Sequence, residues 1–237
     1  NSITSGGNYN VVVGDEAGTA LTTGDNNVAV GYAALDAEDT GTNSVAIGYN
    51  ALTAQNNDAA NYNVAVGSSA GAAVTTGTQN TLIGALAGDA LTSGNNNVVV
   101  GMNALSTDTL GDRAVAVGTE ALANQNFTTT TDNYNVAIGF HAGNDVTTGV
   151  ENSIIGGLAG DALTIGYQNV VNGFQALSAE TTGSRNVAIG INALNASNMG
   201  GSTSVTSYNV AVGALAGAAV TTGLNNTLIG SLSGDAL

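Results

Sequence analysis

The chain contains no cysteine, proline, tryptophan or lysine, and these absences narrow what the protein can be. Without cysteine it forms no disulfide and no thiolate metal site. Its only two basic residues, Arg113 and Arg185, stand against 17 acidic ones, so it is poorly suited to neutralise the phosphates of a nucleic acid. The same balance disfavours an anionic membrane surface, and no apolar run approaches the roughly 20 residues of a membrane-spanning helix.

Charge and aromatic rings are also scarce. Charged residues make up 8% of the chain, against about 25% in ordinary domains, and aromatic residues make up 4%. The hydrophobic share of 43% consists mostly of alanine and valine. A core built from such small side chains is thin, which suits stacked strands better than one large globule. The formal net charge of −15 favours solubility and attracts divalent cations.

What the chain does contain is a short motif, typically Asn-Val-Ala-Val-Gly, repeated along its whole length. Most motifs follow one another at intervals of 17 residues, and three intervals are longer, at 19, 21 and 23 residues. Every fourth coil carries the extra residues, so four coils form a super-repeat of about 72 residues. The closing glycines are Gly14, Gly31, Gly48, Gly67, Gly84, Gly101, Gly118, Gly139, Gly156, Gly173, Gly190, Gly213 and Gly230.

The insertions lie near residues 55–61, 125–133 and 198–207, and each polar insertion leads into a tyrosine, at Tyr62, Tyr134 and Tyr208. Insertions at one place in a solenoid map to loops on one face, so we expect a row of protruding loops, one for every four coils. Residues 1–237 are interpreted as a single repetitive segment. Because the chain begins and ends inside a repeat, we expect it to be a fragment of a longer protein.

The motif predicts β-structure. Its apolar part is three residues long, rich in valine and isoleucine, and ended by glycine, and β-branched residues favour strands. Units of 17 residues are too short for the helix pairs of α-solenoids. We therefore predict an all-β fold, a parallel β-solenoid or β-roll of about 13 stacked 17-residue coils. Each coil is expected to hold two short strands and two turns, stacked at about 4.8 Å.

An asparagine lies four residues before the motif glycine in 11 of the 13 coils. Stacked identical amides form hydrogen-bonded ladders at the spacing of parallel strands. We interpret this column as a structural ladder rather than a row of ligand-binding amides. It includes Asn10, Asn27, Asn63, Asn80, Asn97 and Asn135.

The motif strand is apolar on both faces. In Val28-Ala29-Val30 the valines point one way and the alanine the other, yet all three are apolar. Such strands are usually buried on both faces, and one thin roll covers only one of them. In one type of coil the middle residue is larger and its predecessor polar, as in Thr81-Leu82, a volume exchange that suits two packed faces. We therefore predict a homo-oligomer, a trimer around the fibre axis. A monomer that encloses both faces is the alternative.

Two families of repeats resemble this sequence over essentially its whole length. The segment Asn43-Ser-Val-Ala-Ile-Gly48 is similar to the head repeats of trimeric autotransporter adhesins. The block Asn27-Val-Ala-Val-Gly-Tyr-Ala-Ala-Leu35 resembles repeats of phage tail-fibre proteins. The first resemblance implies a trimeric left-handed β-roll that binds host surfaces, and the second implies a fibre shaft used in host recognition. Both imply an extracellular location, on a virion tail fibre or on a bacterial cell surface.

Few residues point to chemistry. The sequence has no nucleophile elbow, phosphate-binding loop, dinucleotide fingerprint or zinc motif, so we expect neither an enzyme nor a bound cofactor. Asp89, Asp161 and Asp235 recur at one super-repeat position. They are candidates for Ca²⁺ sites shared between copies around a trimer axis, or for turn caps. Arg113 and Arg185 also share a position, and each either contacts an acidic residue of a neighbouring chain or lies solvated at the surface.

The leading functional hypothesis is a structural and adhesive fibre that attaches to a host or surface. Glycan or receptor binding by the inserted loops is the second hypothesis. Its candidates are Phe127, which lies inside a loop, and Tyr62, Tyr134 and Tyr208, which otherwise plug the base of each loop. Ice binding by the Thr-Thr-Gly turns is a third possibility, although Leu110, Ile165 and Met199 interrupt the threonine column. A polysaccharide-degrading tailspike is a fourth, but no paired carboxylates stand out from the repeat.

Overall fold

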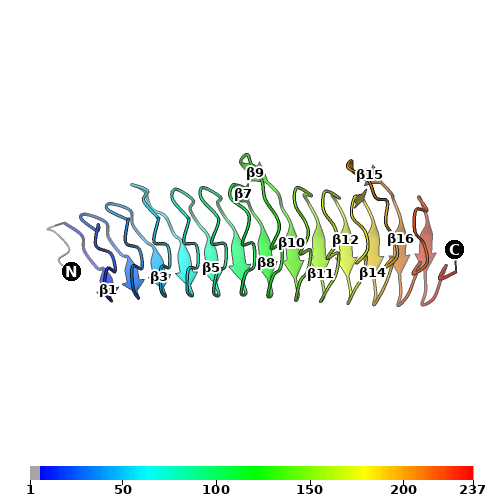
Figure 1. Cartoon of the computed structure of the whole chain (residues 1–237), viewed down its shortest axis with the longest axis horizontal. Helices are drawn as coiled ribbons and strands as arrows, with labels where there is room; N and C mark the ends of the chain where they lie inside the picture. Colours follow the sequence, from blue (N-terminus) through cyan, green and yellow to red (C-terminus); the bar gives the residue numbers. More distant parts are fainter. Residues whose placement is uncertain (1–5, 237) are drawn as a thin grey trace. The chain divides into compact units, whose positions relative to one another are not determined.

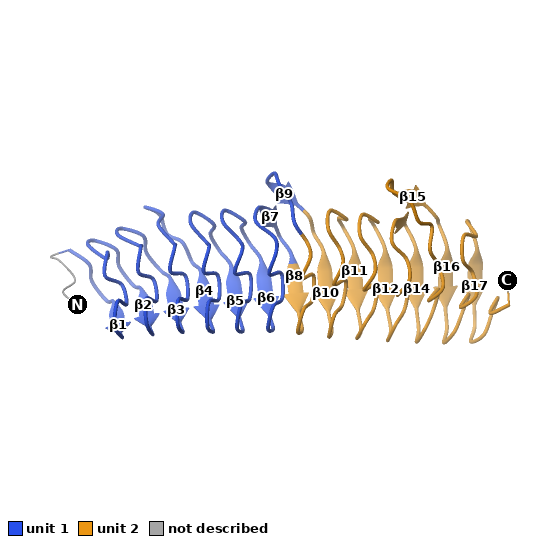
Figure 2. Ribbon diagram, in the orientation of Figure 1, with its two compact units in different colours: residues 1–114, 126–132 blue, residues 115–125, 133–237 orange. Residues whose placement is uncertain are grey.

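A computed structural model describes residues 6–236 and contains strands and turns but no helix within that range. The fold is a parallel β-solenoid of about 13 turns, as the repeat predicts. Its contacts divide it into two compact units (Figure 2). Unit 1 comprises residues 1–114 and 126–132, and unit 2 comprises residues 115–125 and 133–237.

Unit 1 stacks one short strand per coil (Figure 1). Neighbouring strands pair in parallel and in register, so that Val28 lies opposite Val45 and Ala29 opposite Ala46. The strands of this sheet are β1 (Val11–Val13), β2 (Val28–Val30), β3 (Val45–Ile47), β4 (Val64–Val66), β5 (Thr81–Ile83) and β6 (Val98–Val100). A separate parallel pair, β7 (Gly111–Asp112) with β9 (Thr131–Asp132), carries the inserted loop.

Unit 2 repeats the arrangement. Its sheet contains β8 (Val115–Val117), β10 (Val136–Ile138), β11 (Ser153–Ile155), β12 (Val170–Asn172), β14 (Val187–Ile189), β16 (Val210–Val212) and β17 (Thr227–Ile229). The loop that precedes β16 is tied down by a second parallel pair, β13 (Gly183–Ser184) with β15 (Val205–Thr206). Figure 1 shows this loop extending beyond the turns next to it.

Most coils hold one regular strand rather than the two that we expected, and only the four coils that contain β7, β9, β13 or β15 have a second, two-residue strand. After the motif glycine the chain turns twice through the left-handed region, as at Asn50 (φ 54°) and Leu52 (φ 48°), and an extended strand does not tolerate such angles. The sides of the coil without a strand are still joined to the next coil by backbone hydrogen bonds. For example, the N–H of Leu35 donates to the carbonyl of Ala51 over 3.0 Å.

The motif glycine is required by both conformation and space. Gly31 has a φ of 131°, which side chains of L-residues rarely adopt. A Cβ atom at this position would lie 2.4 Å from the carbonyl oxygen of Gly48 in the next coil. Parallel stacking of one glycine on another therefore fixes this residue type in every coil.

The core lies inside each coil, and the middle residue of the strand points into it. Ala46 and Leu82 are fully buried, whereas the residues on either side of them are half-exposed or exposed. A Cβ atom at Gly71 would lie 2.6 Å from Cδ1 of Leu82 and 3.0 Å from Cδ2 of Leu52. Leucines of the two adjacent coils thus fill the space that this glycine leaves. The volume exchange seen in the sequence occurs between stacked coils of one chain.

Buried asparagines connect the coils on the inner side of each strand. The Asn80 side chain donates from Nδ2 to the carbonyl of Gly94 over 2.8 Å. Its Oδ1 accepts the backbone N–H of Asn97 over 3.0 Å, and Oδ1 of Asn63 accepts the N–H of Asn80 in the same way over 2.9 Å. Unit 2 repeats the pattern at Asn152 and Asn169. Both ends of each amide are used, which satisfies buried backbone groups that would otherwise be unpaired.

Candidate functional site

The outer face of each sheet is an exposed apolar surface, which we call the sheet face: the first and third residues of the motif strands. These positions carry valine, isoleucine, threonine, serine or asparagine and no charged residue. Ile83 in unit 1 and Ile138 in unit 2 are each 39% exposed. Successive strands in parallel register place like residues side by side, so the surface is regular along the stack of coils.

A row of residues borders the sheet face immediately after the motif glycine, and it includes exposed apolar side chains alongside polar ones such as Asp15 and Thr119. In unit 1 the rings of Tyr32 and Tyr49 stack with centroids 5.4 Å apart and planes inclined by 14°. A hydrogen bond to Glu16, together with the charge of that carboxylate, raises the pKa of the Tyr32 hydroxyl. In unit 2 the same position exposes Phe140 and Phe174. Sequence reasoning missed this row, although its signal was an aromatic residue directly after the motif glycine.

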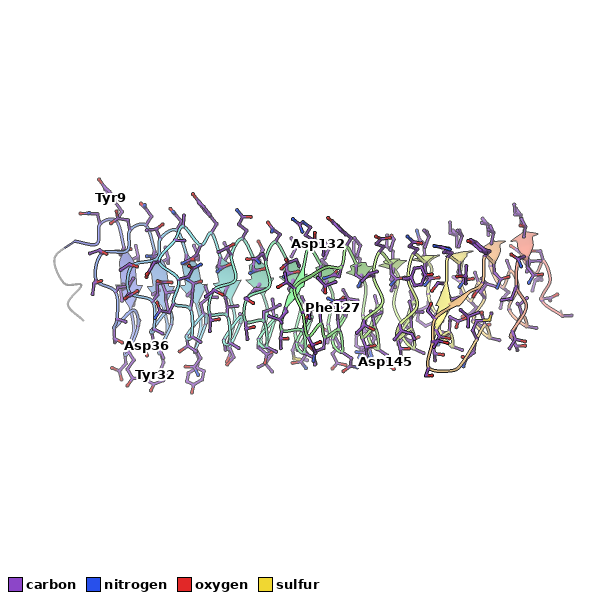
Figure 3. All side chains as sticks on the ribbon, turned by 90° about the horizontal axis from the view of Figure 1, so that it is seen from above. Tyr9, Tyr32, Asp36, Phe127, Asp132 and Asp145 are labelled. Atoms are coloured by element: carbon purple, nitrogen blue, oxygen red, sulfur yellow. The ribbon has the colours of Figure 1, made fainter. Side chains whose placement is uncertain are left out.

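The aromatic residues at the inserted loops differ from the prediction that the tyrosines plug the loops: the tyrosines are exposed and the phenylalanine is buried. Tyr62, Tyr134 and Tyr208 do not plug the loops, because between 51% and 56% of each residue is exposed. Phe127 is the buried residue, at 6% exposure, and Figure 3 shows it within the outline of the ribbon while Asp132 stands at the edge. The glycan-binding hypothesis therefore has exposed rings at the tyrosines but none at Phe127.

Buried carboxylates hold the loops in place, and sequence reasoning missed them. They lie seven residues after the motif glycine in the coil before each insertion: Glu38, Asp108 and Glu180, all fully buried. Glu180 Oε1 accepts the backbone N–H groups of residues 181–183 and Met199 over 2.7–3.1 Å. Its Oε2 accepts the Ser197 hydroxyl over 2.8 Å. Their recurrence at one super-repeat position was the available signal.

The two equivalent carboxylates of unit 1 use a different set of donors. Glu38 accepts the N–H of Gly41 over 2.8 Å and the side-chain amides of Gln55 and Asn61 over 3.0 and 3.1 Å. Asp108 accepts the N–H of Phe127 over 3.1 Å, which ties the inserted loop to the coil beneath it. These carboxylates accept hydrogen bonds from neutral backbone and side-chain groups, and such charge-assisted bonds hold the loops in place.

The two arginines have different partners. In unit 1 Arg113 follows β7 and forms an ion pair with Asp132 of β9. In unit 2 Arg185 follows β13, and its guanidinium lies over the rings of Tyr167 and Tyr208, at 5.4 and 5.6 Å from the ring centroids. These partners belong to the same chain.

The aspartates of the Ca²⁺ hypothesis do not converge. Oδ1 of Asp89 and Oδ1 of Asp161 are buried and accept no hydrogen bond, whereas backbone N–H groups of the same turns bond to both carboxyls, so turn capping stays a prediction. Burial raises the pKa of both carboxyls. Asp235 is exposed. Within residues 6–236, no group of three or more acidic, histidine or cysteine side chains is arranged to hold a metal ion. A Ca²⁺ site shared between copies stays a prediction.

The threonines of the turns, which suggested ice binding, use some of their hydroxyls for hydrogen bonds between neighbouring coils. The hydroxyl of Thr75 donates to the carbonyl of Thr92 in the next coil over 3.2 Å, and Thr164 donates to Thr181 over 2.8 Å. The hydroxyls thus support the stacking of the coils and are not all directed at solvent.

Comparison with known proteins identifies no relative of this chain. No family model, curated protein or solved structure matches it. The resemblance to adhesin heads and tail-fibre repeats therefore stays a prediction. Over the described part of the chain, no helix has the length and apolar character needed to cross a membrane.

Proposed function

We propose that this chain is an extracellular structural fibre segment that assembles as a homotrimer through its sheet faces and serves attachment to a host or surface. A phage tail fibre or a bacterial surface adhesin is the setting that its repeats favour. This function requires no catalytic residues. The hydrogen-bonded stack of coils bears the mechanical load, and exposed side chains of the coils and inserted loops make the contacts with the host or surface.

The observation that carries the proposal is the charge-free apolar sheet face of a strongly acidic chain. The chain has a net charge of −15, yet the outward strand positions contain no carboxylate. Packing these faces together keeps the acidic residues of the copies away from the contact, where like charges would be costly. A second copy of the chain is the partner that this distribution suits best.

The size of the face supports the same partner. Seven strands at about 4.8 Å spacing and three residues per strand give the sheet face of unit 2 an area of about 340 Å². This area lies within the range of the largest apolar patch on a typical soluble monomer, and such patches often mark binding sites. The bordering residues, such as Phe140 and Phe174, enlarge it further.

The test is the solution mass by size exclusion coupled to light scattering. We expect three times the chain mass of 23.0 kDa. Ile155→Asp places a charge on the exposed sheet face and is expected to shift the mass toward that of one chain. Thr148→Asp, on an exposed turn outside that face, is the matched control and leaves the trimer intact. A wild-type monomer, or a trimer that Ile155→Asp leaves unaffected, contradicts the proposed assembly.

A further inference from the structure

The arginine at the inserted loop is paired with a carboxylate in unit 1 but not in unit 2. Arg113 and Arg185 occupy one super-repeat position, just after β7 and β13. The strands that pair with these, β9 and β15, contribute Asp132 and Thr206 at corresponding positions, opposite Asp112 and Ser184. Asp132 neutralises Arg113. Where unit 1 supplies this carboxylate, unit 2 has a threonine.

Arg185 is nevertheless held in a defined position. Its Nε donates to Oε1 of Gln168 over 2.9 Å, and its Nη1 donates to the hydroxyl of Tyr208 over 2.9 Å. The rings of Tyr167 and Tyr208 lie against its guanidinium. Gln168 is itself oriented by a hydrogen bond from its Nε2 to Glu151, over 2.7 Å. These contacts fix the guanidinium before any ligand arrives, which lowers the entropic cost of binding.

The binding capacity of this arginine is only partly used. A guanidinium carries five N–H donors, and two of them take part in the bonds to Gln168 and Tyr208. No carboxylate among residues 6–236 lies within 4.0 Å of its nitrogens. The side chain is exposed, so its remaining N–H groups are accessible to an anion.

We propose that Tyr167, Arg185 and Tyr208 form a binding site for an acidic saccharide, with the carboxylate of a uronic acid paired to Arg185. The planar fork of arginine N–H groups matches a carboxylate, and such charge-assisted pairs are stronger than hydrogen bonds between neutral groups. Tyr208, at 51% exposure, adds an apolar ring edge and a hydroxyl beside the cation. A saccharide uses all three features, whereas a small anion uses only the charge.

The site is separate from the surface proposed for self-association. Its residues precede the motif strands, outside the first and third strand positions that make up the sheet face. The net charge of −15 opposes the approach of an anion at long range, and added salt screens that repulsion. Short-range pairing at Arg185 is less affected by salt, so specific binding is expected to persist at physiological ionic strength.

The experiment uses the whole chain and a short oligogalacturonate as the probe, with binding measured by calorimetry. Neutral oligogalactoside of the same length and sodium acetate are the comparison ligands. We expect the oligogalacturonate to bind at least tenfold more tightly than either. Absence of binding at millimolar concentration, or equal binding of the neutral sugar, overturns the proposal, and equal binding of acetate reduces it to a simple anion site.

Two variants locate the site. Thr206→Asp supplies the carboxylate that unit 1 has at Asp132, and it is expected to pair with Arg185 and weaken binding at least tenfold. Arg113→Gln removes the other arginine and is the matched control, with unchanged affinity. Unchanged affinity in Thr206→Asp rules the site out. Light scattering on the same samples reports the oligomeric mass, so failure of this site is distinguished from failure of the proposed trimer.

Discussion

Unit 1 and unit 2 are built by the same rules but place different chemistry at equivalent positions. Both have the same strand pairing, glycine turns and buried asparagines. At the inserted loops, however, Arg113 of unit 1 pairs with Asp132, while Arg185 of unit 2 rests on two tyrosines. The stacking of the coils therefore constrains the residue types inside each coil, whereas the residues at the inserted loops can differ between the units. Differences between the units are therefore the best guide to function.

The buried loop carboxylates should give the largest difference between the units. Glu180→Ala leaves four backbone N–H groups and the Ser197 hydroxyl without their acceptor, so we expect a loss of about 3 kcal/mol or more. Glu38→Ala in unit 1 is expected to cost less, about 2 kcal/mol, because two of its three donors are side-chain amides that can reorient.

Coils contact mainly their neighbours, so the loss should be local, and amide hydrogen exchange at residues 181–200 is the appropriate measurement. Thr148→Ala, at an exposed turn position, is the control. If protection of this loop is the same in Glu180→Ala and in the control, the carboxylate does not organise the loop.

The crowded core glycines should show the next largest effect. Gly71→Ala in unit 1 brings Cβ to 2.6 Å from Leu82, whereas Gly143→Ala in unit 2 brings it to 2.9 Å from Ile154. Both glycines have positive φ, so each variant is strained, and we expect losses of about 2–3 kcal/mol, larger at Gly71. Gly160→Ala has a positive φ but no contact below 3.5 Å, and it isolates the conformational cost at about 1 kcal/mol. Chemical denaturation measures all three, and equal losses would refute the steric account.

Removing the exposed ion pair of unit 1 should change stability only slightly. Arg113 and Asp132 are each more than 40% exposed, so Asp132→Thr is expected to cost at most about 1 kcal/mol. Thermal unfolding at low and high salt measures this cost, which should shrink as salt increases. Unit 1 has Asn95 and Asn96 where unit 2 has Tyr167 and Gln168, so Asp132→Thr frees an arginine without the rest of the proposed saccharide site. We therefore expect this variant to bind no second equivalent of oligogalacturonate.

The smallest effect concerns the half-buried aspartates, Asp89 in unit 1 and Asp161 in unit 2. Burial raises the folded-state pKa of both above 3.8, and the charge of Asp145 raises that of Asp161 further. A raised folded pKa means that ionisation disfavours the folded state at neutral pH, and this penalty disappears as the pH falls through the folded pKa. Asp161→Asn should therefore raise the melting temperature at pH 7, with the gain shrinking toward pH 3.8. A gain that is independent of pH would contradict this explanation.

Much of the fold could be predicted because its constraints are local and repeated. The motif predicted the position and parallel stacking of every motif strand in both units. The predicted second strand is absent from most coils, because left-handed turns at residues such as Asn50 and Leu52 interrupt the extended chain. Asparagine and leucine do not predict a left-handed backbone conformation as clearly as glycine does.

The candidate site was predicted less well. The tyrosines after the insertions were singled out, but whether Tyr208 or Phe127 is exposed depends on how the loop folds back. The partner of Arg185 was not predictable, because Tyr167 and Tyr208 come from different coils and meet it only after stacking. The buried carboxylate Glu180 was passed over, since an acidic residue at a coil position is usually solvated.

The sequence by itself determined the period of the solenoid, its β-structure, its thin core and the sites of its loops, because each follows from residue types recurring at fixed intervals. It did not determine which face of the motif strand lies inside. Val28, Ala29 and Val30 are all apolar, so the alternation of side chains along the strand does not indicate which of them face the core. Tertiary structure decided that Ala29 is buried and the valines face outward, because the turns after the motif glycine bend the chain around the side of the strand that carries the middle residue.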